Sequence, residues 1–598
     1  MALPGIQNFT VVDGSLSLST EDFKGIKVVI GPANAGLYNT IFSFNSAQDA
    51  VTVLNGGRLV NAIGVSLDIA GGPIYAMRMQ TSVAGSIGTQ IKSLISGSDG
   101  ALATTGSNPV EDNDVIIFMT RAGKVGTAPY PAFTYSLDGG ITVSDEIAVP
   151  VAGTYNVPQS GIVLVFSNGA VGFKAGDSFR FTTVAASWNN SDLSNALAAV
   201  LADSTRQYEF VHIIGAQDAT LASTVASYMT IAETNERDLH AICEVRDMRY
   251  LASLDTTANT FPMTFAGTEV LKIQVSTDFG LTFPTTQSIT VPAAAYASAA
   301  ALAAALNTSA FTGGLFTVTS SATLIQIVFI SDKGKVVLKV DNTSTAIGGA
   351  LLQYTGGQIG QGELEDAWMT SLQTTFASFV SPRVELVAGH ADIFSSVARR
   401  YVRESGAWLV SGRTSLVPVS EDLGAVERGP LPLIVTPDTG KGIYGIYHDE
   451  DSKYGLDPAR FTTLRKHKGL KGFYITQGRT FANAGSDYMF IQYRRVMDQA
   501  SHYFRIASKK YINKRVQVNP NGTLYIVDRQ DIEREIRSYI STNLQGEILD
   551  VQVVVDPNEV ILQTQKLKID VAILPYGYSK YLSLRIGYAP VQNVVSLV

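Results

Sequence analysis

The sequence is poor in several residue types, and each shortage excludes a class of protein. Cys243 is the single cysteine among 598 residues, so the chain has no intramolecular disulfide framework. Only 16% of the residues are charged while 45% are hydrophobic, which excludes an intrinsically disordered chain. No apolar run reaches the ~18 residues of a transmembrane helix, and the opening MALPGIQNFT lacks the regions of a signal peptide. We therefore expect a folded protein with neither a membrane span nor a secretory leader.

Motifs for catalysis and nucleotide binding are also missing. The sequence contains no HExxH, CxxC, GxSxG or P-loop pattern, and Cys243 lies in an apolar stretch. His212 and His390 fall in predicted buried strands, where a core position is a simpler interpretation than metal ligation. The acidic cluster HDEDSKYGLD at residues 448–457 admits a metal or catalytic role, but a solvated loop or a charge partner for the basic residues that follow explains it better. We expect no enzymatic activity, no metal and no cofactor.

The chain is longer than the ~250–300 residues that one hydrophobic core supports, so we expect several domains. Buried strands that alternate with helices predict an α/β domain with parallel strands, and two stretches rich in Gly, Ser and Thr interrupt it with short strands. The fold class is therefore α+β and multidomain. The predicted parts are an N-terminal arm (1–21), an α/β domain (22–80, 188–254 and 365–432), two β-rich insertions (81–187 and 255–364) and a C-terminal core domain with long strands (433–598).

Within the α/β pieces the pattern is specific enough to place elements. Strands are predicted at residues 26–31, 71–79, 208–215, 239–245 and 383–390. Helices are predicted at residues 46–55, 191–203 (with Ser191 as the cap), 219–238, 366–380 and 392–406.

The two β-rich insertions share a short motif. Ser136-Leu-Asp138-Gly-Gly140 in the first resembles Ser276-Thr-Asp278-Phe-Gly280 in the second. An Asp followed two residues later by Gly suits a hairpin turn with positive φ, so we interpret the insertions as a duplicated β-module. A calcium loop is the sharper alternative, but one carboxylate per copy supplies too few oxygen ligands.

The C-terminal region contains the most regular pattern. Residues 492–515 predict an amphipathic helix whose polar face carries the basic side chains Arg494, Arg495, Arg505, Lys509 and Lys510. A second helix at 529–544 has Asp528 as its predicted cap and an apolar stripe of Ile532, Ile536 and Ile540. Alternating residues at 548–556 and 559–574 predict two long strands.

Charge is distributed unevenly. From Arg460 to Arg515 there are 13 Lys or Arg and two acidic residues, a net +11, which leaves −18 for the rest of a chain whose formal charge is −7. An acidic protein with one basic region suits an acidic protein partner, or an acidic face of its own copies, better than nucleic acid. A solvated charged helix is the alternative.

The order of these features resembles one family. An N-terminal PGI arm, the strand end GGPIYAMRM, the β-rich insertions and the run YRRVMDQASHYFRIASKKYIN, followed by VNPNGTLYIVDRQDIEREI and two long strands, together resemble the contractile tail sheath proteins of bacteriophages. The resemblance extends over nearly the whole chain in organisation and is most specific in the arm and in residues 433–598.

The resemblance implies a structural role. Sheath subunits polymerise as stacked hexameric rings around an inner tube, and contract to drive the tube through the host envelope for genome ejection. The implied partners are copies of the chain, the inner tail tube protein, and the baseplate and tail terminator proteins, with no nucleic acid and no direct membrane insertion. The implied location is the virion tail, assembled in the host cytoplasm.

The resemblance also implies particular residues. The tube-facing residues would be Arg494, Arg495, Lys509 and Lys510. The strands donated to neighbouring subunits would contain Val11, Val12, Leu16 and Leu18 in the arm, and Val594, Val595 and Leu597 in the tail. Their acceptor would be an edge beside residues 548–555 or 560–573.

Two alternatives remain open. The sheath of a bacteriocin or of a secretion-type contractile injection system is mechanically the same protein. A surface adhesin or glycan-binding structural protein would explain the β-rich insertions but would leave the basic helix without a role.

Overall fold

The computed structural model describes residues 24–88, 90–248, 252–276, 282–308, 316–329, 336–348, 351–434 and 448–584. Its contacts divide the chain into two compact units: unit 1 takes Met1–Pro418 and Leu423–Arg494, and unit 2 takes Val419–Asp422 and Arg495–Val598. The predicted arm and the predicted donor strand of the tail lie outside the described residues.

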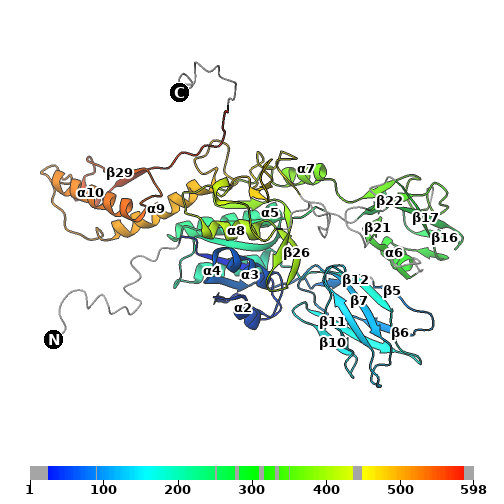
Figure 1. Cartoon of the computed structure of the whole chain (residues 1–598). Coiled ribbons are helices and arrows are strands. Elements are labelled where there is room, and N and C mark those ends of the chain that lie inside the picture. The colour runs from blue at the N-terminus through cyan, green and yellow to red at the C-terminus, as the bar shows by residue number, and fades with distance from the viewer. Residues whose placement is uncertain are drawn as a thin grey trace, which may run out of the picture. The chain divides into compact units, whose positions relative to one another are not determined.

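The centre of unit 1 is a six-stranded sheet (Figure 1). Its strands are hydrogen-bonded in the order β2-β3-β1-β13-β14-β24. Its strands are β1 (Lys27–Gly31), β2 (Ile41–Phe44), β3 (Ile74–Arg78), β13 (Phe210–Gln217), β14 (His240–Val245) and β24 (Val384–Val387). All neighbours pair in parallel except β2, which runs antiparallel to β3 at the edge. The five strands predicted from the sequence are confirmed, with ends shifted by a few residues.

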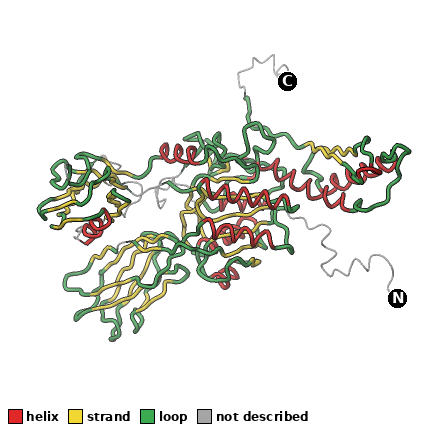
Figure 2. The backbone as a smooth tube through the Cα atoms, turned by 180° about the vertical axis from the view of Figure 1, so that it is seen from behind, coloured by secondary structure: helices red, strands yellow, loops and turns green. Residues whose placement is uncertain are grey.

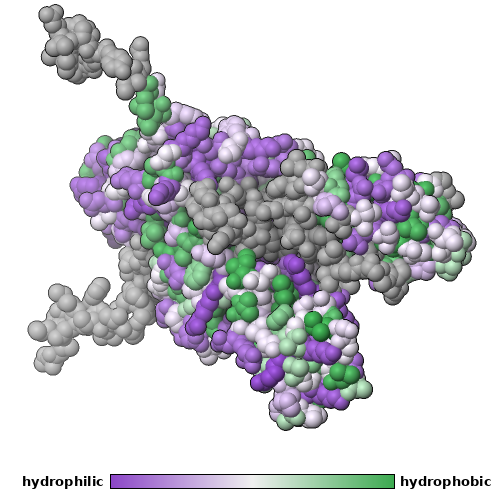
Figure 3. Space-filling model, turned by 45° about the vertical axis from the view of Figure 1, so that its right-hand side comes forward, coloured by the Kyte–Doolittle hydropathy of each residue, from purple (hydrophilic) through white to green (hydrophobic). Residues whose placement is uncertain are grey.

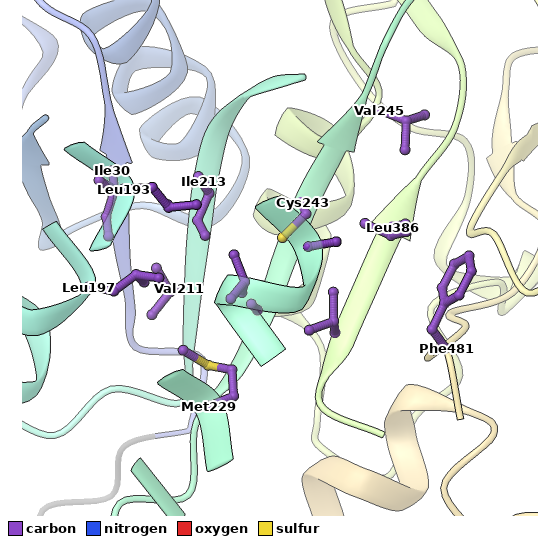
Figure 4. Packing of buried hydrophobic residues seen from close by; sticks show 14 of the residues in the cluster. Ile30, Leu193, Leu197, Val211, Ile213, Met229, Cys243, Val245, Leu386 and Phe481 are labelled. Carbon is purple, nitrogen blue, oxygen red and sulfur yellow. The ribbon is translucent and has the colours of Figure 1, made fainter. Parts of the chain in front are cut away.

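Helices cover both faces of this sheet, as parallel strands require. One layer contains α4 (Asn190–Ala202), α5 (Ala219–Thr234) and α7 (Glu365–Thr375), and the other contains α2 (Ala47–Leu54), α3 (Arg58–Ala70) and α8 (Ala407–Leu416). Neighbouring residues of β1 serve opposite layers, since Ile30 packs in the first and Val29 in the second. Figure 4 shows Leu193 and Leu197 of α4 beside strand residues of the first layer.

The predicted helices at 46–55, 191–203, 219–238 and 366–380 are confirmed, but one cap is wrong. The cap of α4 is Asn189, whose side chain accepts hydrogen bonds from the amides of Ser191 and Asp192. The helices α3 and α8 were not predicted, although both are buried over most of their length. Residues 59–66 of α3 are buried without interruption.

The first β-rich segment forms antiparallel strands in the orders β10-β11-β6 and β4-β12-β7-β8-β9, with β5 also paired to β12. In Figure 2 this segment consists of strands (yellow) and loops (green). The strands are β4 (Ser86–Ile87), β5 (Ile91–Ser93), β6 (Gly100–Ala103), β7 (Asp114–Arg121), β8 (Ala132–Ser136), β9 (Ile147–Ala148), β10 (Thr154–Val157), β11 (Ile162–Asn168) and β12 (Ser178–Val184).

The turn predicted after β8 is confirmed. The Asp138 carboxylate accepts hydrogen bonds from the Ser136 hydroxyl and from the amide and hydroxyl of Thr142, at 2.6–2.9 Å. Gly139 and Gly140 have φ of 74° and 100°, which glycine adopts without strain. The carboxylate is engaged within the turn itself. In the second copy of the motif, Asp278 and Gly280 lie outside the described residues.

A buried polar network ties the first β-rich segment to the α/β body. The Arg400 guanidinium donates to Glu111 at 2.7 Å and to the Asn113 side-chain oxygen at 2.8 Å. The Asn61 amide donates to Glu111 at 2.5 Å and accepts from the Ser395 hydroxyl at 2.8 Å. Because each of these buried groups has a partner, the network fixes the segment rather than destabilising it.

The second β-rich segment has a core of its own, formed by residues between 252 and 354. Its strands pair in the orders β15-β21-β20, β16-β19 and β18-β17-β22-β23. Its elements are β15 (Ser253–Asp255), β16 (Met263–Phe265), β17 (Val270–Ser276), β18 (Thr285–Thr290), β19 (Ala294–Tyr296), α6 (Ala299–Thr308), β20 (Phe316–Ser321), β21 (Leu324–Phe329), β22 (Val337–Val340) and β23 (Ile359–Gln361). Where the chain enters and leaves the segment, the Arg246 guanidinium donates twice to Glu363, at 2.6 Å each.

The helix predicted at residues 392–406 is wrong. The chain forms a hairpin of β25 (His390–Ser395) and β26 (Arg400–Ser405), with Arg399 at a φ of 53° in its turn. The apolar residues recur at three- and four-residue steps, which also fits a helix. Cross-strand pairing selects the hairpin over the helix. The Phe394 and Tyr401 rings, for example, pack edge to face with their centres 5.4 Å apart.

Unit 1 ends with the short helix η2 (Val426–Arg428) and a hairpin of β27 (Leu464–Arg465) and β28 (Tyr474–Ile475). On the face drawn in Figure 3, hydrophobic residues occur in small groups among hydrophilic ones.

Unit 2 is built from α9 (Ile491–Lys509), which begins in unit 1, and from α10 (Ile526–Asn543), β29 (Asp550–Val555), α11 (Ile561–Thr564) and β30 (Ile569–Leu574). In Figure 1 these elements are orange to brown. The predicted stripe of α10 is confirmed: Ile532, Ile536 and Ile540 are buried against α9 and the inward residues of β29.

Two details of unit 2 differ from the prediction. The cap of α10 is Tyr525, and Asp528 lies in the first turn, where its carboxylate accepts from the Gln517 amide at 2.8 Å. The predicted strand at 559–574 is divided into α11 and β30, because its partner β29 is only six residues long and pairs with residues 569–574 alone.

Replacing Ile536 by Ala should weaken unit 2 selectively. Ile536 is 0% exposed, and loss of a buried Ile side chain costs about 2–5 kcal/mol. We expect the α10 amides to exchange with deuterium faster in Ile536→Ala, while β1 and β13 of unit 1 keep their wild-type rates. Val527→Ala, at an exposed position of the same helix, is the control. Equal acceleration in both variants would contradict the packing assigned to Ile536.

Candidate functional site

The four basic residues predicted to face a partner do not share one exposed surface. Arg494 and Arg495 are 5% and 0% exposed. The Arg494 guanidinium lies 4.6 Å from the centre of the Tyr488 ring and 3.8 Å from a carboxylate oxygen of Glu233. The expectation that both arginines belong to an exposed polar face is therefore wrong, because α9 is enclosed on nearly all sides over residues 491–500.

Lys509 and Lys510 are exposed at the end of α9. The turn that follows adds exposed Lys514 and Arg515, and Ile512, between Lys510 and Lys514 in the sequence, is 69% exposed. We refer to Lys509, Lys510, Lys514 and Arg515 as the α9 basic end. A cluster of like charges around one apolar side chain attracts an acidic protein surface and gives it something to pack against.

The α9 basic end is anchored to α10 through Glu535. The Glu535 carboxylate accepts a hydrogen bond from the Tyr511 hydroxyl at 2.5 Å and forms an ion pair with Lys510. Burial raises the pKa of Tyr511, and the hydrogen bond to Glu535 raises it further. The Lys510 and Tyr511 hydrogen bonds lower the pKa of Glu535. This carboxylate therefore stays ionised at neutral pH and fixes the last turn of α9.

The second candidate surface is the antiparallel pair β29-β30. Six residue pairs join the strands, from Asp550–Leu574 to Val555–Ile569. Within the described ranges neither strand has a further partner, so each has an outer edge of main-chain groups. Such an edge accepts an added strand. The predicted donors, Val11, Val12, Leu16, Leu18, Val594, Val595 and Leu597, lie outside the described residues.

The segment that leaves β30 is attached to unit 2 by polar contacts. The Tyr578 hydroxyl donates to the Ser420 carbonyl, and Lys580 forms an ion pair with Asp422. The Ser420 hydroxyl in turn donates to Glu547 at 2.6 Å. The chain is thus held by residues 419–422 just before the predicted donor strand.

The basic stretch from Arg460 to Arg515, continuous in sequence, is divided between the units. Arg479 is paired with Asp457 at 3.0 Å, and the Arg460 guanidinium lies 4.8 Å from the centre of the Phe481 ring. The exposed charges that remain belong to the β27–β28 hairpin of unit 1 and to the α9 basic end of unit 2.

A polar cavity of about 190 Å³ lies at the carboxyl ends of β13 and β14. In open parallel sheets this is where ligands bind. Its lining includes Arg58, Glu244, Asp247, Arg403 and Glu404.

The charges of this cavity are paired with one another. The Arg58 guanidinium donates to Glu404 at 2.5 and 3.0 Å and to Glu244 at 3.1 Å, and Arg403 donates to Asp247 at 2.7 Å. Burial raises the pKa of Glu404, and the contacts with Arg58 oppose that rise. Burial acts likewise on Glu244, but Arg58 and other groups hold its pKa down at about 2. These ion pairs join α3, β14 and the β25–β26 hairpin. The charged residues of the cavity therefore hold neighbouring elements together.

No pattern in the sequence pointed to Arg58, Arg400, Arg403 or Glu404 as residues of one cluster. Three of them lie on β26, which was predicted as a helix. The alternation of polar His390 and Asp392 with apolar Ala391 and Ile393 is the sequence signal that would have indicated a strand, and in the structure Ala391 and Ile393 are the buried residues of these four.

The acidic cluster at 448–457 pairs with basic residues that follow it, as one interpretation predicted. Asp451 pairs with Arg465 at 2.7 Å, and Asp457 with Arg479. It is not a solvated loop, since Asp449, Glu450 and Asp457 are buried.

Within the ranges that the structure covers, no three or more His, Cys, Asp or Glu side chains are grouped so that they could hold a metal ion. His212 is 0% exposed, in agreement with a core position. A search of the same ranges finds no helix with the length and apolarity needed to cross a membrane.

Two family models together match most of the chain. The DUF2586 N-terminal domain matches residues 3–271 and 350–479, and the DUF2586 C-terminal domain matches residues 487–593. The chain therefore belongs to the DUF2586 family. Residues 272–349, which neither model matches, lie inside the second β-rich segment. The boundary between the two matched domains falls between residues 479 and 487, before α9. No curated protein matches the sequence.

Among solved structures, the chain is similar to sheath proteins. It shares 11% identity with the sheath tail protein of Desulfitobacterium hafniense, at a TM-score of 0.38, covering 92% of this chain and 97% of that one. It shares 11% identity with the sheath tail protein of Listeria innocua, at a TM-score of 0.36, and the match covers 96% of this chain and 99% of that one. With the helical sheath of the anti-feeding prophage in the contracted state it shares 8% identity, at a TM-score of 0.41, and the match covers 98% of this chain and 100% of that one.

His448 is enclosed between two carboxylates. Its Nδ1 lies 2.8 Å from Glu365 Oε1, and its Nε2 lies 2.8 Å from Glu450 Oε2. Burial lowers the pKa of His448, but the hydrogen bonds to Glu365 and Glu450 outweigh it and raise the pKa overall above 6.5. The ring thus joins α7 to the loop at 448–457, and protonation of the ring strengthens both contacts.

This pairing predicts a pH dependence of stability. A histidine whose pKa is raised by folding stabilises the fold fully below its unfolded pKa, and the contribution is lost as pH rises through the folded pKa. We expect the margin in unfolding temperature between wild type and His448→Gln to be largest below pH 6.5 and to shrink at higher pH. His467→Gln, at a partly exposed ring, is the control. A margin that does not change with pH would contradict this role.

Proposed function

We propose that this chain is the structural subunit of a contractile sheath, which polymerises around an inner tube and shortens to drive the tube through a cell envelope. The construction of unit 2 is the observation that carries the proposal. It combines an exposed basic helix end with a strand pair that has no third strand among the described residues. The resemblance of the sequence to tail sheath proteins supports the same function.

In this proposal the α9 basic end faces the tube. Lys509 and Lys510 are the predicted tube contacts that the fold leaves exposed, and Lys514 and Arg515 extend them. Exposed ion pairs are worth only ~0.2–1 kcal/mol each, so a set of them can be released together when the sheath contracts. Arg494 and Arg495 support α9 from inside the chain.

Neighbouring subunits are joined by strand exchange. Residues 11–18 of the arm and 591–598 of the tail would each add to the edge of a β29-β30 pair in another copy. A main-chain ladder is not tied to particular side-chain contacts, so it can persist while subunits rotate. Contraction is then a switch between two packings of one lattice, passed from ring to ring.

We propose stacked hexameric rings in the virion tail of a phage, assembled in the host cytoplasm and bounded by baseplate and tail terminator proteins. A bacteriocin or a secretion-type injection system would use the same subunit. Identification of the particle that contains the chain, with or without a genome-filled head, distinguishes these devices.

Deletion of residues 1–20 tests the assembly. In negative-stain micrographs the full chain, alone at rising concentration or with its tube protein, should form hollow tubes of regular repeat. The deletion variant should stay folded by circular dichroism but form no tubes, because the donated strand is lost. Normal tubes from the variant would contradict strand exchange by the arm, and absence of tubes from the full chain under both conditions would contradict the proposed function.

Charge reversal tests the tube contact. The double variant Lys509→Glu/Lys510→Glu should weaken tube-templated assembly by about tenfold at low salt and less at high salt, since exposed charges are screened. The control Lys92→Glu/Lys124→Glu makes the same charge change at exposed positions of the first β-rich segment. Assembly at low salt that equals wild type would show that the α9 basic end serves another contact.

A further inference from the structure

The β27–β28 hairpin carries positive charge that the proposed function does not use. Its sequence RKHKGLK at residues 465–471 contains four Lys or Arg and one His, with no acidic residue. Lys468, Leu470 and Lys471 are exposed. We refer to residues 464–475 as the basic hairpin.

The base of the basic hairpin is fixed. Leu464 and Ile475 are buried in the second core layer of unit 1. The Leu431 amide donates to the Phe473 carbonyl at 2.7 Å, and the His467 and Tyr474 rings meet edge to face at 5.1 Å. The charged loop is therefore presented in a defined position, which lowers the entropy lost on binding.

Contacts within unit 1 account for part of this charge. Arg465 pairs with Asp451, and the Lys466 ammonium lies 5.1 Å from the centre of the Phe473 ring. In the part of the chain that the structure describes, neither Lys468 nor Lys471 is placed in an ion pair. Like charges gathered on one short loop repel, and an acidic partner surface relieves that repulsion.

We propose that the basic hairpin binds a carboxylate-rich surface on a second copy of this chain. The part of the chain outside residues 460–515 carries a net −18, so another copy offers the complementary charge. Leu470, 47% exposed between Lys468 and Lys471, supplies an apolar centre within a charged rim. That combination is typical of protein interfaces.

The inference rests on the proposed function to the extent that copies assemble. It concerns a surface of unit 1, and the tube contact of the α9 basic end in unit 2 is separate from it. The basic hairpin would thus contribute a side-chain contact between copies in addition to strand exchange.

Zero-length cross-linking tests the partner directly. Full chain with natural nitrogen is mixed with nitrogen-15-labelled chain, assembled and treated with a carbodiimide, which joins lysine ammonium groups to carboxylates in contact. We expect mixed-isotope peptides that link Lys468 or Lys471 to Asp or Glu of another copy, and these would name the acidic surface. Assembly with intermolecular links elsewhere but none at these lysines would contradict the inference alone, whereas failure to assemble would contradict the proposed function.

Charge reversal gives an independent measurement. In Lys468→Glu/Lys471→Glu the concentration for half-maximal assembly should rise about tenfold at low salt, with a smaller rise at high salt. The control Lys92→Glu/Lys124→Glu should stay within about twofold of wild type, because changes at surface positions without partners have small effects. Wild-type assembly by the hairpin variant would overturn the inference. If the variant assembles like wild type but no longer binds a duplex DNA probe that wild type binds, the inference is overturned as well, because the hairpin would then bind nucleic acid.

Discussion

Coverage of both faces of one parallel sheet is the constraint on which unit 1 depends. Parallel strands need crossover connections, and their apolar residues point alternately to two layers, so helices must come from distant parts of the chain. Here α2–α3, α4–α5 and α7–α8 come from three separate stretches of sequence. The β-rich segments occupy connections between these stretches, where an insertion leaves the central sheet intact. A buried network through Glu111 and Arg400 then fixes the first segment to the body.

The chain has few charges and uses many of its cations internally. Arg58, Arg383, Arg400 and Arg403 pair with carboxylates while largely buried, and Arg494 lies beside Glu233. Breaking one buried pair costs about 3–5 kcal/mol, because it leaves an uncompensated charge. Positive charge that stays exposed therefore stands out. Within residues 460–515 it lies on the α9 basic end and the basic hairpin, which are the surfaces that we propose for the tube and for a second copy.

The family match divides the molecule in a way that agrees with its packing. Residues 272–349 fall outside the match, and they lie within the segment that has its own core. A segment that buries its apolar residues internally can be gained or lost without exposing the core of the body. The first β-rich segment lies within the match, and its polar network with the α/β body is buried. The shared part of the family therefore includes both units and the first segment.

The sequence by itself determined the elements whose periodicity has one interpretation. The central strands and the stripe Ile532, Ile536 and Ile540 follow from local spacing. Tertiary structure decided the hairpin at 390–405, the division of 559–574 and the burial of Arg494 and Arg495. In each case the local pattern fits two structures, and the partner available in space selects one. A helix pattern shows which residues share a face, but only the packed neighbours decide whether a polar face meets water.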